Sequence, residues 1–403
     1  MKPVNAVVFT LMFAVPLPAQ SDLRAGEIEA DRQAKSQRLT PDRPGTLERR
    51  MNWFENSSWV NGLLGGGEGL RVSLGGLGQS QGFAAGVSYN RRDLWNGRLA
   101  VRSSIHGSVR QAYMIDLGIT VPRLAAGKSF VDVYSAHYNY PNMQFYGEGP
   151  QSSKNGRGVY RLENTLLQAR SGFRLRRRLT IGATGGLQSI NVGRGENSAL
   201  GHTEEIYSDA QAPGVHRQST FLQTGGYIQY DWRNEGAQPV RGGMYRSEYS
   251  VFSDRDQGRH NFNRLDLAVQ QYLPLFHAKR VIAFQGATVL TDAHRGNTVP
   301  FYLQPVVGGA ETLRGYRPFR FYGDNSMVLN CEYRFEASSL LDLALFADAG
   351  KVFQRWGEWN LHRLESDVGV GFRFKSQQRV VLRIDTAISQ EGVMIWFRFN
   401  DVF

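Results

Sequence analysis

The chain has 403 residues, of which 45 are glycine and 12% are aromatic, and its formal net charge is +11 at pH 7. This composition, without a long helical pattern, favours one large all-β unit over two or three soluble domains. The basic residues are dispersed, with Arg176-Arg177-Arg178 as the only dense run. We therefore expect the basic side chains to contact lipid head groups and a polar interior, and we expect no nucleic-acid partner.

Residues 1–19 have the pattern of a secretory signal peptide. Lys2 precedes a short apolar core that runs from Ala6 to Val15, and Pro16, Pro18 and Ala19 follow it. No later stretch approaches the roughly 18 consecutive apolar residues that a membrane-spanning helix requires. We therefore expect cleavage near Ala19 and export of the mature protein from the cytoplasm.

Residues 20–68 are predicted to form a short periplasmic segment, polar and charged at first. After Pro44, the apolar residues Leu47, Met51 and Phe54 recur with helical spacing. This spacing predicts a short amphipathic helix over residues 44–55, and a disordered tether is the alternative. A segment this short and this poor in apolar residues is too small to bury a core of its own.

From residue 69 onward the sequence contains sixteen segments with strand character, an even number, as a closed bacterial barrel requires. They start near Leu70, Phe83, Leu99, Ala112, Phe130, Val159, Leu179, Thr220, Met244, Phe262, Val281, Ser326, Leu341, Leu364, Val380 and Val393. The three longest connections, 141–157, 192–216 and 292–323, follow odd-numbered segments, whereas short ones such as 172–176, 274–279 and 376–378 follow even-numbered segments. This alternation predicts a 16-stranded antiparallel transmembrane β-barrel over residues 69–403, with the short turns and both termini on the periplasmic side.

The alternation inside a strand predicts which side chains face lipid. In the segment that starts near Val380, we expect Val380, Leu382 and Ile384 to face outward. Arg383 and Asp385 would then face a wet lumen, where a charged side chain costs less free energy than in lipid.

Two neighbouring predicted strands place one carboxylate each on the same polar face. In the segment 327–335 apolar residues alternate with polar ones, so Glu332 points away from the apolar side. In the segment 341–348 the same alternation sends Asp348 to that polar face. The long loop before these strands contains Arg314. We expect its guanidinium to fold back between the two carboxylates and to form charge-assisted, bidentate hydrogen bonds.

These residues resemble the motifs of the Omp85 superfamily, a group of outer-membrane β-barrels that includes bacterial surface antigens and the barrel-assembly and two-partner-secretion translocators. Leu313-Arg314-Gly315-Tyr316 is similar to the family's arginine-glycine-aromatic motif on the sixth extracellular loop. Phe346-Ala347-Asp348-Ala349-Gly350 is similar to its phenylalanine-aspartate-glycine strand motif, and Glu332 matches the acidic position on the intervening strand. Tyr230-Asp231-Trp232-Arg233 resembles the strand that opens the second half of the family's barrel.

The resemblance implies insertion or translocation of polypeptide or lipid at the outer membrane. The mechanism would use a weak lateral seam between the first strand, near Leu70, and the last, over residues 393–403, with the loop of Arg314, Gly315 and Tyr316 narrowing the lumen. Residues 20–68 are too few for a POTRA module, the docking domain of most family members. Clients would therefore arrive through a separate periplasmic partner, a homo-oligomer or the lipid phase. A passive or gated pore is the alternative function.

The end of the chain carries aromatic residues at Phe397, Phe399 and Phe403. This pattern resembles the signal that the barrel-assembly machinery reads. It departs from that signal at Asp401, two positions before the end, where an apolar residue is usual. The resemblance therefore implies the barrel-assembly machinery as a partner in the chain's own insertion. It also implies contact with outer-membrane lipids and lipopolysaccharide, in the cell outer membrane of a Gram-negative-type bacterium.

The sequence contains no nucleophile elbow, zinc-protease motif or paired cysteine site, so we expect no enzyme activity, no metal and no cofactor. Gly127-Lys128-Ser129 lacks the first glycine of a phosphate loop, because Pro122 occupies that position. The segment 254–258 has calcium-like spacing but is more typical of a hairpin turn. Cys331, the only cysteine, is expected to act as a small hydrophobic side chain on the lipid face.

Overall fold

The computed structural model describes residues 68–399 except 198, 235–237, 277–278, 339 and 377–378. Within this part, a 16-stranded sheet forms in which every strand pairs with the next one in the sheet. Its strands are β1 (Gly69–Gly76), β2 (Phe83–Asp93), β3 (Leu99–Ser108), β4 (Tyr113–Leu124), β5 (Ser129–Phe145), β6 (Gly158–Arg176), β7 (Leu179–Arg194), β8 (Thr220–Asp231), β9 (Gly242–Asp254), β10 (Phe262–Leu275), β11 (Arg280–Ala293), β14 (Asn325–Ser338), β15 (Leu341–Phe353), β16 (Glu365–Ser376), β17 (Arg379–Ser389) and β18 (Gly392–Phe399). The predicted signal peptide, the predicted helix over residues 44–55 and Phe403 lie outside the described residues.

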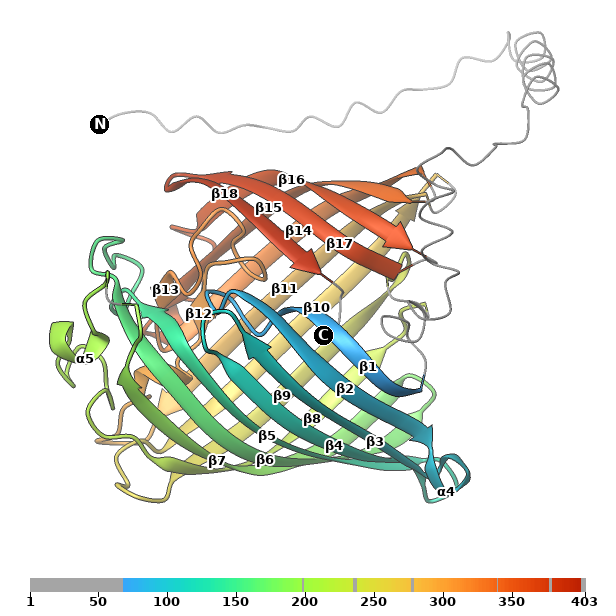
Figure 1. Cartoon of the computed structure of the whole chain (residues 1–403), viewed down its shortest axis with the longest axis horizontal. Helices are drawn as coiled ribbons and strands as arrows, with labels where there is room; N and C mark the ends of the chain where they lie inside the picture. The colour runs from blue at the N-terminus through green and yellow to red at the C-terminus, as the bar shows by residue number, and fades with distance from the viewer. Residues whose placement is uncertain are drawn as a thin grey trace, which may run out of the picture. The chain divides into compact units, whose positions relative to one another are not determined.

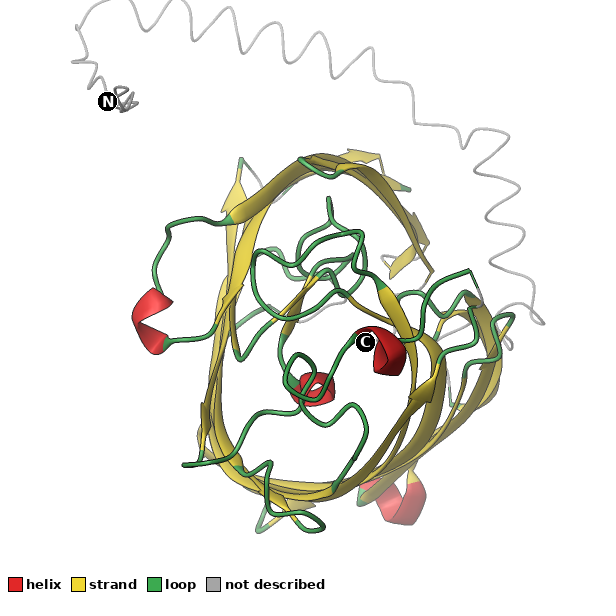
Figure 2. Cartoon of the chain, turned by 90° about the vertical axis from the view of Figure 1, so that its left-hand side faces the viewer, coloured by secondary structure: helices red, strands yellow, loops and turns green. Residues whose placement is uncertain are grey.

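The sheet curls into a barrel of tilted strands (Figure 1), and loops cross its interior (Figure 2). All pairings from β1–β2 to β17–β18 are antiparallel, so the ladder satisfies the backbone groups that face each other between neighbouring strands. The connections contain the short helices α4 (Leu94–Gly97), α5 (Thr203–Ile206), η1 (Phe301–Leu303) and η2 (Trp356–Glu358). No helix in the described residues has the length and apolar character to cross a membrane. The predicted fold class is confirmed.

The predicted strand starts agree closely with the observed ones, the largest difference being at the ninth strand, predicted at Met244 and observed at Gly242. Long connections follow β5, β7 and β11, at residues 146–157, 195–219 and 294–324, as expected.

Two predicted loops overlap the strands most: residues 172–176 lie wholly in β6, and residues 141–145 lie in β5. β6 continues to Arg176, and Gly172 pairs with Phe130 of β5 within the wall. A Cβ at Gly172 would lie 2.4 Å from the Phe130 ring, so glycine leaves room for that ring. β5 continues past Pro141, which sits at a register shift between Tyr140 and Met143 and so withholds no ladder hydrogen bond.

Inward and outward side chains alternate along the strands as the sequence indicates. Leu329 and Leu345 point outward with 39% and 59% of their surface exposed, whereas Glu332 and Asp385 are turned inward and buried. One expectation is wrong: Val380 is 6% exposed and pairs with Lys375, while Leu382 pairs with Phe374. The residue between them forms a β-bulge that reverses the alternation, so Val380 faces the lumen.

The first and last strands of the sheet form a seam. β1 and β18 stand at the two ends of the strand order and approach each other, yet no ladder joins them within the described residues. Each has 8 residues, whereas β6 has 19. Within the described residues, the wall is therefore shortest where its edges meet.

The assignment of faces can be tested at two adjacent residues of β6, Leu167 on the outside and Gln168 on the inside. Leu167→Arg is expected to lower the free energy of unfolding by about 2–4 kcal/mol, because it places a cation in hydrocarbon near the bilayer midplane. Gln168→Arg is expected to lower the free energy of unfolding only slightly, because residue 168 faces the lumen. The measurement is urea unfolding in lipid vesicles, and equal losses for both variants would contradict the assignment.

Candidate functional site

The long loop after β11, residues 294–324, folds back against the inner wall of the barrel, and we call it the lumen loop. Its two halves pair as a short hairpin of β12 (Val306–Val307) and β13 (Phe321–Tyr322). The tip, residues 308–320, starts at Gly308, where φ is +121° and a Cβ would lie 2.7 Å from the carbonyl oxygen of Arg317. Only glycine fits this turn without strain. The hairpin thereby presents Arg314 to the inner wall.

Arg314 binds both predicted carboxylates. Its Nε and Nη2 donate to the two oxygens of Asp348 at 2.7 and 2.8 Å, and its Nη1 donates to Glu332 Oε2 at 2.8 Å. The guanidinium also stacks on the ring of Phe346, with Cζ 3.4 Å from the centroid. This fork-to-carboxylate geometry is the one that arginine forms best. The structure thus brings Arg314, Glu332 and Asp348 together as the sequence predicts.

Gly315 allows the tip to approach the wall. A Cβ at this position would lie 2.5 Å from the Cβ of Asp367 and 2.8 Å from the Cβ of Ser389. The neighbouring Tyr316 is 1% exposed, and its hydroxyl donates to Glu365 Oε2 at 2.7 Å. The residues on either side of Arg314 therefore fit the tip to β16 and β17.

The charge cluster extends beyond the three predicted residues. Glu332 also accepts hydrogen bonds from Arg334 at 2.9 Å and from Arg373 at 3.1 Å. Asp385 accepts from Arg373 at 2.6 Å and from Arg383 at 2.5 Å. We call the whole set the Arg314 cluster; its members are Arg314, Glu332, Arg334, Asp348, Arg373, Arg383 and Asp385. Strand parity places Arg383 and Asp385 in the lumen, but it does not show that Asp385 pairs with Arg373 or that Arg383 lies 3.7 Å from Glu332.

The centre of the cluster is dry. The side chains of Arg314, Glu332 and Asp348 are 5%, 8% and 0% exposed, so this contact excludes water although the sequence predicts a wet lumen. Charges this deeply buried stay ionised only when each is paired and hydrogen-bonded. Glu332 meets this requirement with several arginines, whereas Asp348 depends on Arg314 and on Asn330, whose Nδ2 donates to it at 2.8 Å.

The tip is also fastened to the last strands of the barrel. Trp396 Nε1 on β18 donates to the carbonyl oxygen of Arg314 at 2.6 Å, and Ser389 Oγ donates to that of Gly315 at 2.7 Å. Arg320 donates to Glu391 at 2.7 Å and to the carbonyl oxygen of Ser152 at 2.6 Å. Sequence reasoning missed these contacts, although the parity of β18 would have placed Trp396 inside.

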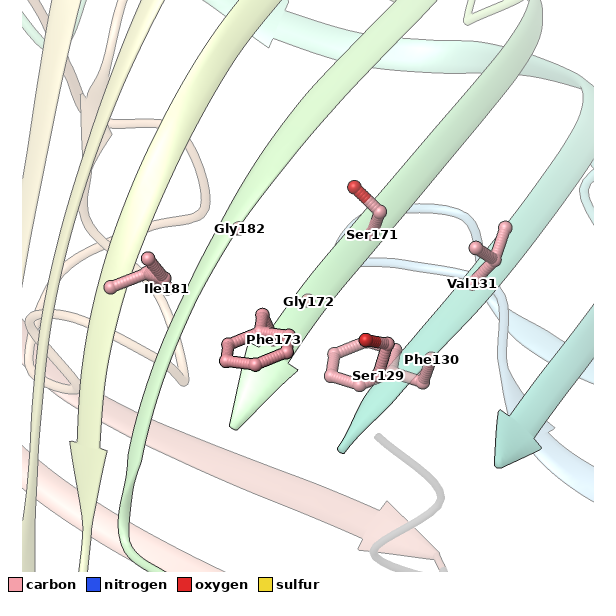
Figure 3. A pocket seen from close by; sticks show the side chains of 8 residues that line it. All are labelled: Ser129, Phe130, Val131, Ser171, Gly172, Phe173, Ile181 and Gly182. Atoms are coloured by element: carbon pink, nitrogen blue, oxygen red, sulfur yellow. The ribbon is translucent and has the colours of Figure 1, made fainter. Parts of the chain in front are cut away.

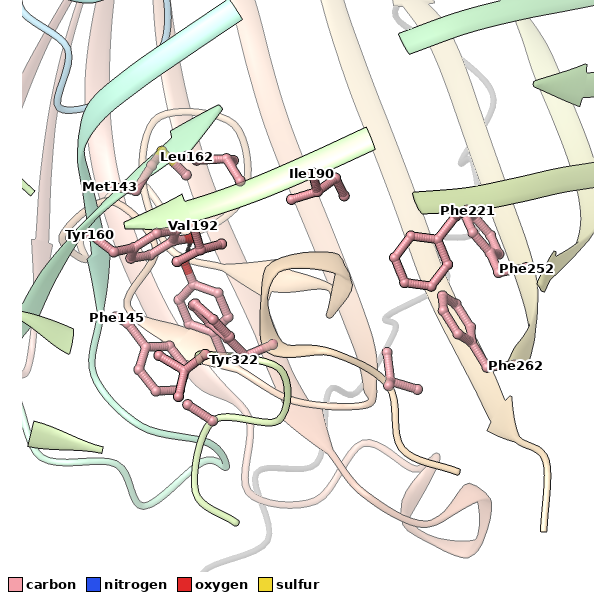
Figure 4. Packing of buried hydrophobic residues seen from close by; sticks show 14 residues of the cluster. Met143, Phe145, Tyr160, Leu162, Ile190, Val192, Phe221, Phe252, Phe262 and Tyr322 are labelled. Atoms are coloured by element: carbon pink, nitrogen blue, oxygen red, sulfur yellow. Dashed lines mark hydrogen bonds between the residues drawn. The ribbon is translucent and has the colours of Figure 1, made fainter. Parts of the chain in front are cut away.

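Apolar packing holds the lumen loop against two walls. Val307, Leu313 and Phe321 are buried against Val328 and Val352 of β14 and β15. On the other side, the loop residues Phe301 and Tyr322 join a buried cluster on the inner wall formed by Met143, Phe145, Tyr160, Leu162, Ile190, Val192, Phe221, Phe252 and Phe262 (Figure 4). The loop therefore spans the lumen from one wall to the other.

Comparison with known proteins now identifies the family. The Omp85 superfamily domain matches residues 63–400. The chain belongs to the Omp85 superfamily. The match confirms the resemblance seen in the motifs around Arg314 and Asp348, and it covers the whole described barrel. No curated protein matches the chain.

Solved structures of Omp85-type barrels share this fold. BamA from Haemophilus ducreyi lacking POTRA domains 1-3 is similar with a TM-score of 0.62 at 15% identity, over 83% of this chain and 70% of that chain. CdiB from Acinetobacter baumannii is similar with a TM-score of 0.52 at 12% identity, over 82% of this chain and 59% of that one. CdiB from Escherichia coli has a TM-score of 0.54 at 14% identity, over 81% of this chain and 61% of that one. This chain thus spans less than two thirds of either CdiB.

The remaining predicted site residues lie on β18 or beyond it. Phe397 points outward with 62% of its surface exposed. The backbone of Phe399 pairs with Leu382 at the end of the ladder, and Phe403 lies outside the described residues.

Two further features of the described Omp85 barrel bear on binding chemistry. A hollow of about 350 Å³ in the wall of β5 to β7 is lined by Ser129, Phe130, Val131, Ser171, Gly172, Phe173, Ile181 and Gly182 (Figure 3). Its lining has no charged group. Asp254 accepts hydrogen bonds from the backbone N–H groups of residues 256, 257, 259 and 260, as in a hairpin turn. The described residues contain no group of three His, Cys, Asp or Glu side chains able to hold a metal ion.

In the loops, the side-chain amide of Gln304 is shared by two acidic side chains, Glu148 and Asp324. They lie where the loop after β5 meets the lumen loop. Gln304 Nε2 donates to Glu148 at 2.6 Å and to Asp324 at 3.2 Å. Burial, with a smaller contribution from the charge of Asp324, raises the pKa of Glu148 to about 7. Burial also raises the pKa of Asp324 above its ordinary value.

Arg314→Ala is expected to lower the free energy of unfolding by about 3–5 kcal/mol, because it leaves Asp348 as a buried charge. The measurement is the temperature at which the barrel loses its compact mobility in gels, together with urea unfolding. Arg314→Ala combined with Asp348→Asn should regain part of the loss. Arg295→Ala, at an exposed residue of the same loop, is the control. Equal stability of Arg314→Ala and Arg295→Ala would contradict the role of the cluster.

The shared amide of Gln304 predicts that docking of the loop after β5 onto the lumen loop depends on pH. Because the pKa of Glu148 is about 7 in the folded protein against an ordinary 4.5, the docked state holds a proton that the undocked state releases. Docking should be strongest below pH 4.5, weaken as pH rises toward about 7, and stay level above that. Glu148→Gln keeps the acceptor and should remove most of this slope, measured as protease cleavage of residues 146–157 against pH. An unchanged slope would exclude Glu148 as its source.

Proposed function

We propose that this barrel resides in the outer membrane of a Gram-negative-type bacterium and inserts or translocates polypeptide or lipid there. The observation that carries the proposal is the seam: β1 and β18 approach each other without a ladder between them in the described residues. A strand edge presents unpaired N–H and C=O groups that recruit another strand. An edge of this kind inside a membrane is a place where a client strand can enter the wall.

The position of the lumen loop favours a lateral rather than an axial route for the client. It packs against β5 to β10 on one side and against β14 and β15 on the other. Passage along the barrel axis would require the loop to leave a buried charge cluster, which is costly. The alternative function, a passive or gated pore, needs this release, whereas entry through the seam does not.

The proposed partners follow from this route. Lipids and lipopolysaccharide surround the barrel, and the barrel-assembly machinery inserts it into the membrane. A separate periplasmic protein or a second copy of the chain delivers the client. The proposal assigns the chain no catalytic step and no cofactor. The similarity to BamA and CdiB supports a membrane role at the level of the family, and the client itself is not specified by it.

A tether across the seam tests the proposal. Leu74→Cys on β1 and Val393→Cys on β18, both exposed residues of the strands that border the seam, are introduced together with Cys331→Ala and joined by a bifunctional thiol reagent long enough to span the seam. In reconstituted vesicles, the tethered barrel should lose the ability to speed membrane insertion of an unfolded eight-stranded barrel, and reduction of a cleavable tether should restore it.

Each single-cysteine variant treated with the same reagent is the control. Insertion of the client at an unchanged rate by the tethered barrel would reject the seam. Planar-bilayer conductance of the same samples separates the alternative: a large current that the tether leaves intact, without any client insertion, would favour the pore.

A further inference from the structure

A group of apolar residues is buried on the outer face of the barrel, where contact with lipid would be expected. By strand parity Leu290, Met327 and Phe353 share the outward face with Leu329 and Leu345. Leu290, Met327 and Phe353 are only 5%, 7% and 2% exposed. Part of the chain must therefore cover them.

The cover is the connection between β15 and β16, residues 354–364, which we call the outer strap. Leu364 packs against the buried group. Lys351, which also points outward from β15, donates through Nζ to Asn360 Oδ1 at 3.0 Å and to the carbonyl oxygen of His362 at 3.1 Å. Trp356 Nε1 donates to the carbonyl oxygen of Thr291 at 3.0 Å. These bonds hold the strap down on the outside of the wall.

The strap in turn exposes large apolar side chains. Trp356, Trp359 and Leu361 are 56%, 52% and 68% exposed. On the same outward face, toward the middle of the wall, lie exposed apolar residues such as Leu345 and its cross-strand partner Val370. The apolar surface of the strap therefore continues the lipid-facing surface of the barrel at its loop end.

The charges of the strap complement a phosphate layer. Arg355 and Arg363 are exposed and flank the apolar residues. The single carboxylate, Glu358, is occupied by the backbone N–H groups of Gln354 and Arg355, at 3.2 and 3.4 Å. Tryptophan prefers the boundary between hydrocarbon and head groups, and arginine binds phosphate oxygens. This set of side chains matches the interface of a bilayer.

We propose that the outer strap docks on the outer leaflet, with Trp359 and Leu361 in the interfacial layer and Arg355 and Arg363 on lipid phosphates. The strap thereby fixes the height of β14 to β16 in the membrane. The proposal requires only that the barrel spans a membrane, and so it is independent of the seam.

Spin labels measure the position of the strap directly. Trp359→Cys and, as control, Asn155→Cys in the exposed loop after β5 are each made with Cys331→Ala and labelled in vesicles of phosphatidylcholine and phosphatidylglycerol. The label at position 359 should collide more with oxygen than with a water-soluble nickel chelate, and the label at position 155 should show the reverse. Equal exposure of both labels to the nickel chelate would overturn the proposal.

Two further arms identify what the strap contacts. Arg355→Gln with Arg363→Gln should shift the label at position 359 toward water in vesicles that contain phosphatidylglycerol, while the barrel keeps its gel mobility on heating. No shift would overturn the phosphate contact. If dilution of the protein in lipid exposes the label at position 359 to the nickel chelate, the strap docks on a second copy, and the lipid proposal fails.

Discussion

The burial of Arg314 is the constraint on which the rest of the site depends. A guanidinium inside a dry protein remains stable only if carboxylates neutralise it and accept its hydrogen bonds. Glu332 and Asp348 do so from adjacent strands, which requires both to have the same strand parity. Gly315 follows from the same constraint, since a side chain there would hold the guanidinium away from the wall.

The cluster also explains why the inner wall has two different halves. Near the loop, the strands β5 to β10 present apolar residues such as Phe145 and Tyr160, and the lumen loop meets them with Phe301 and Tyr322. The strands β14 to β17 instead present Arg373 and Asp385 beside Glu332. Apolar packing tolerates small shifts, whereas bidentate hydrogen bonds have a fixed direction. The charged half therefore determines where the tip lies, and the apolar half supplies area that excludes water.

Strand-level features were predictable because they depend on neighbours in sequence. Period-two alternation placed Glu332 and Asp348 on one face, and the alternation of long and short loops predicted an antiparallel barrel. Contacts such as Arg320 with Glu391, and Trp396 with Arg314, join residues 71 and 82 positions apart. They depend on the path of the loop, which no local pattern encodes. The misplacement of Val380 has a local cause, since one extra residue in a β-bulge reverses the parity.

Three hydrogen bonds join the tip of the lumen loop to the strands on one side of the seam. Trp396, Ser389 and Glu391 all belong to β17, β18 or the turn between them, and all three bind the tip. Movement of β18 away from the seam would break these hydrogen bonds and disturb a buried ion cluster. Movement of β1 breaks none of the three. Because β18 is held by the same loop that carries Arg314, these three hydrogen bonds oppose displacement of the last strands more than displacement of β1.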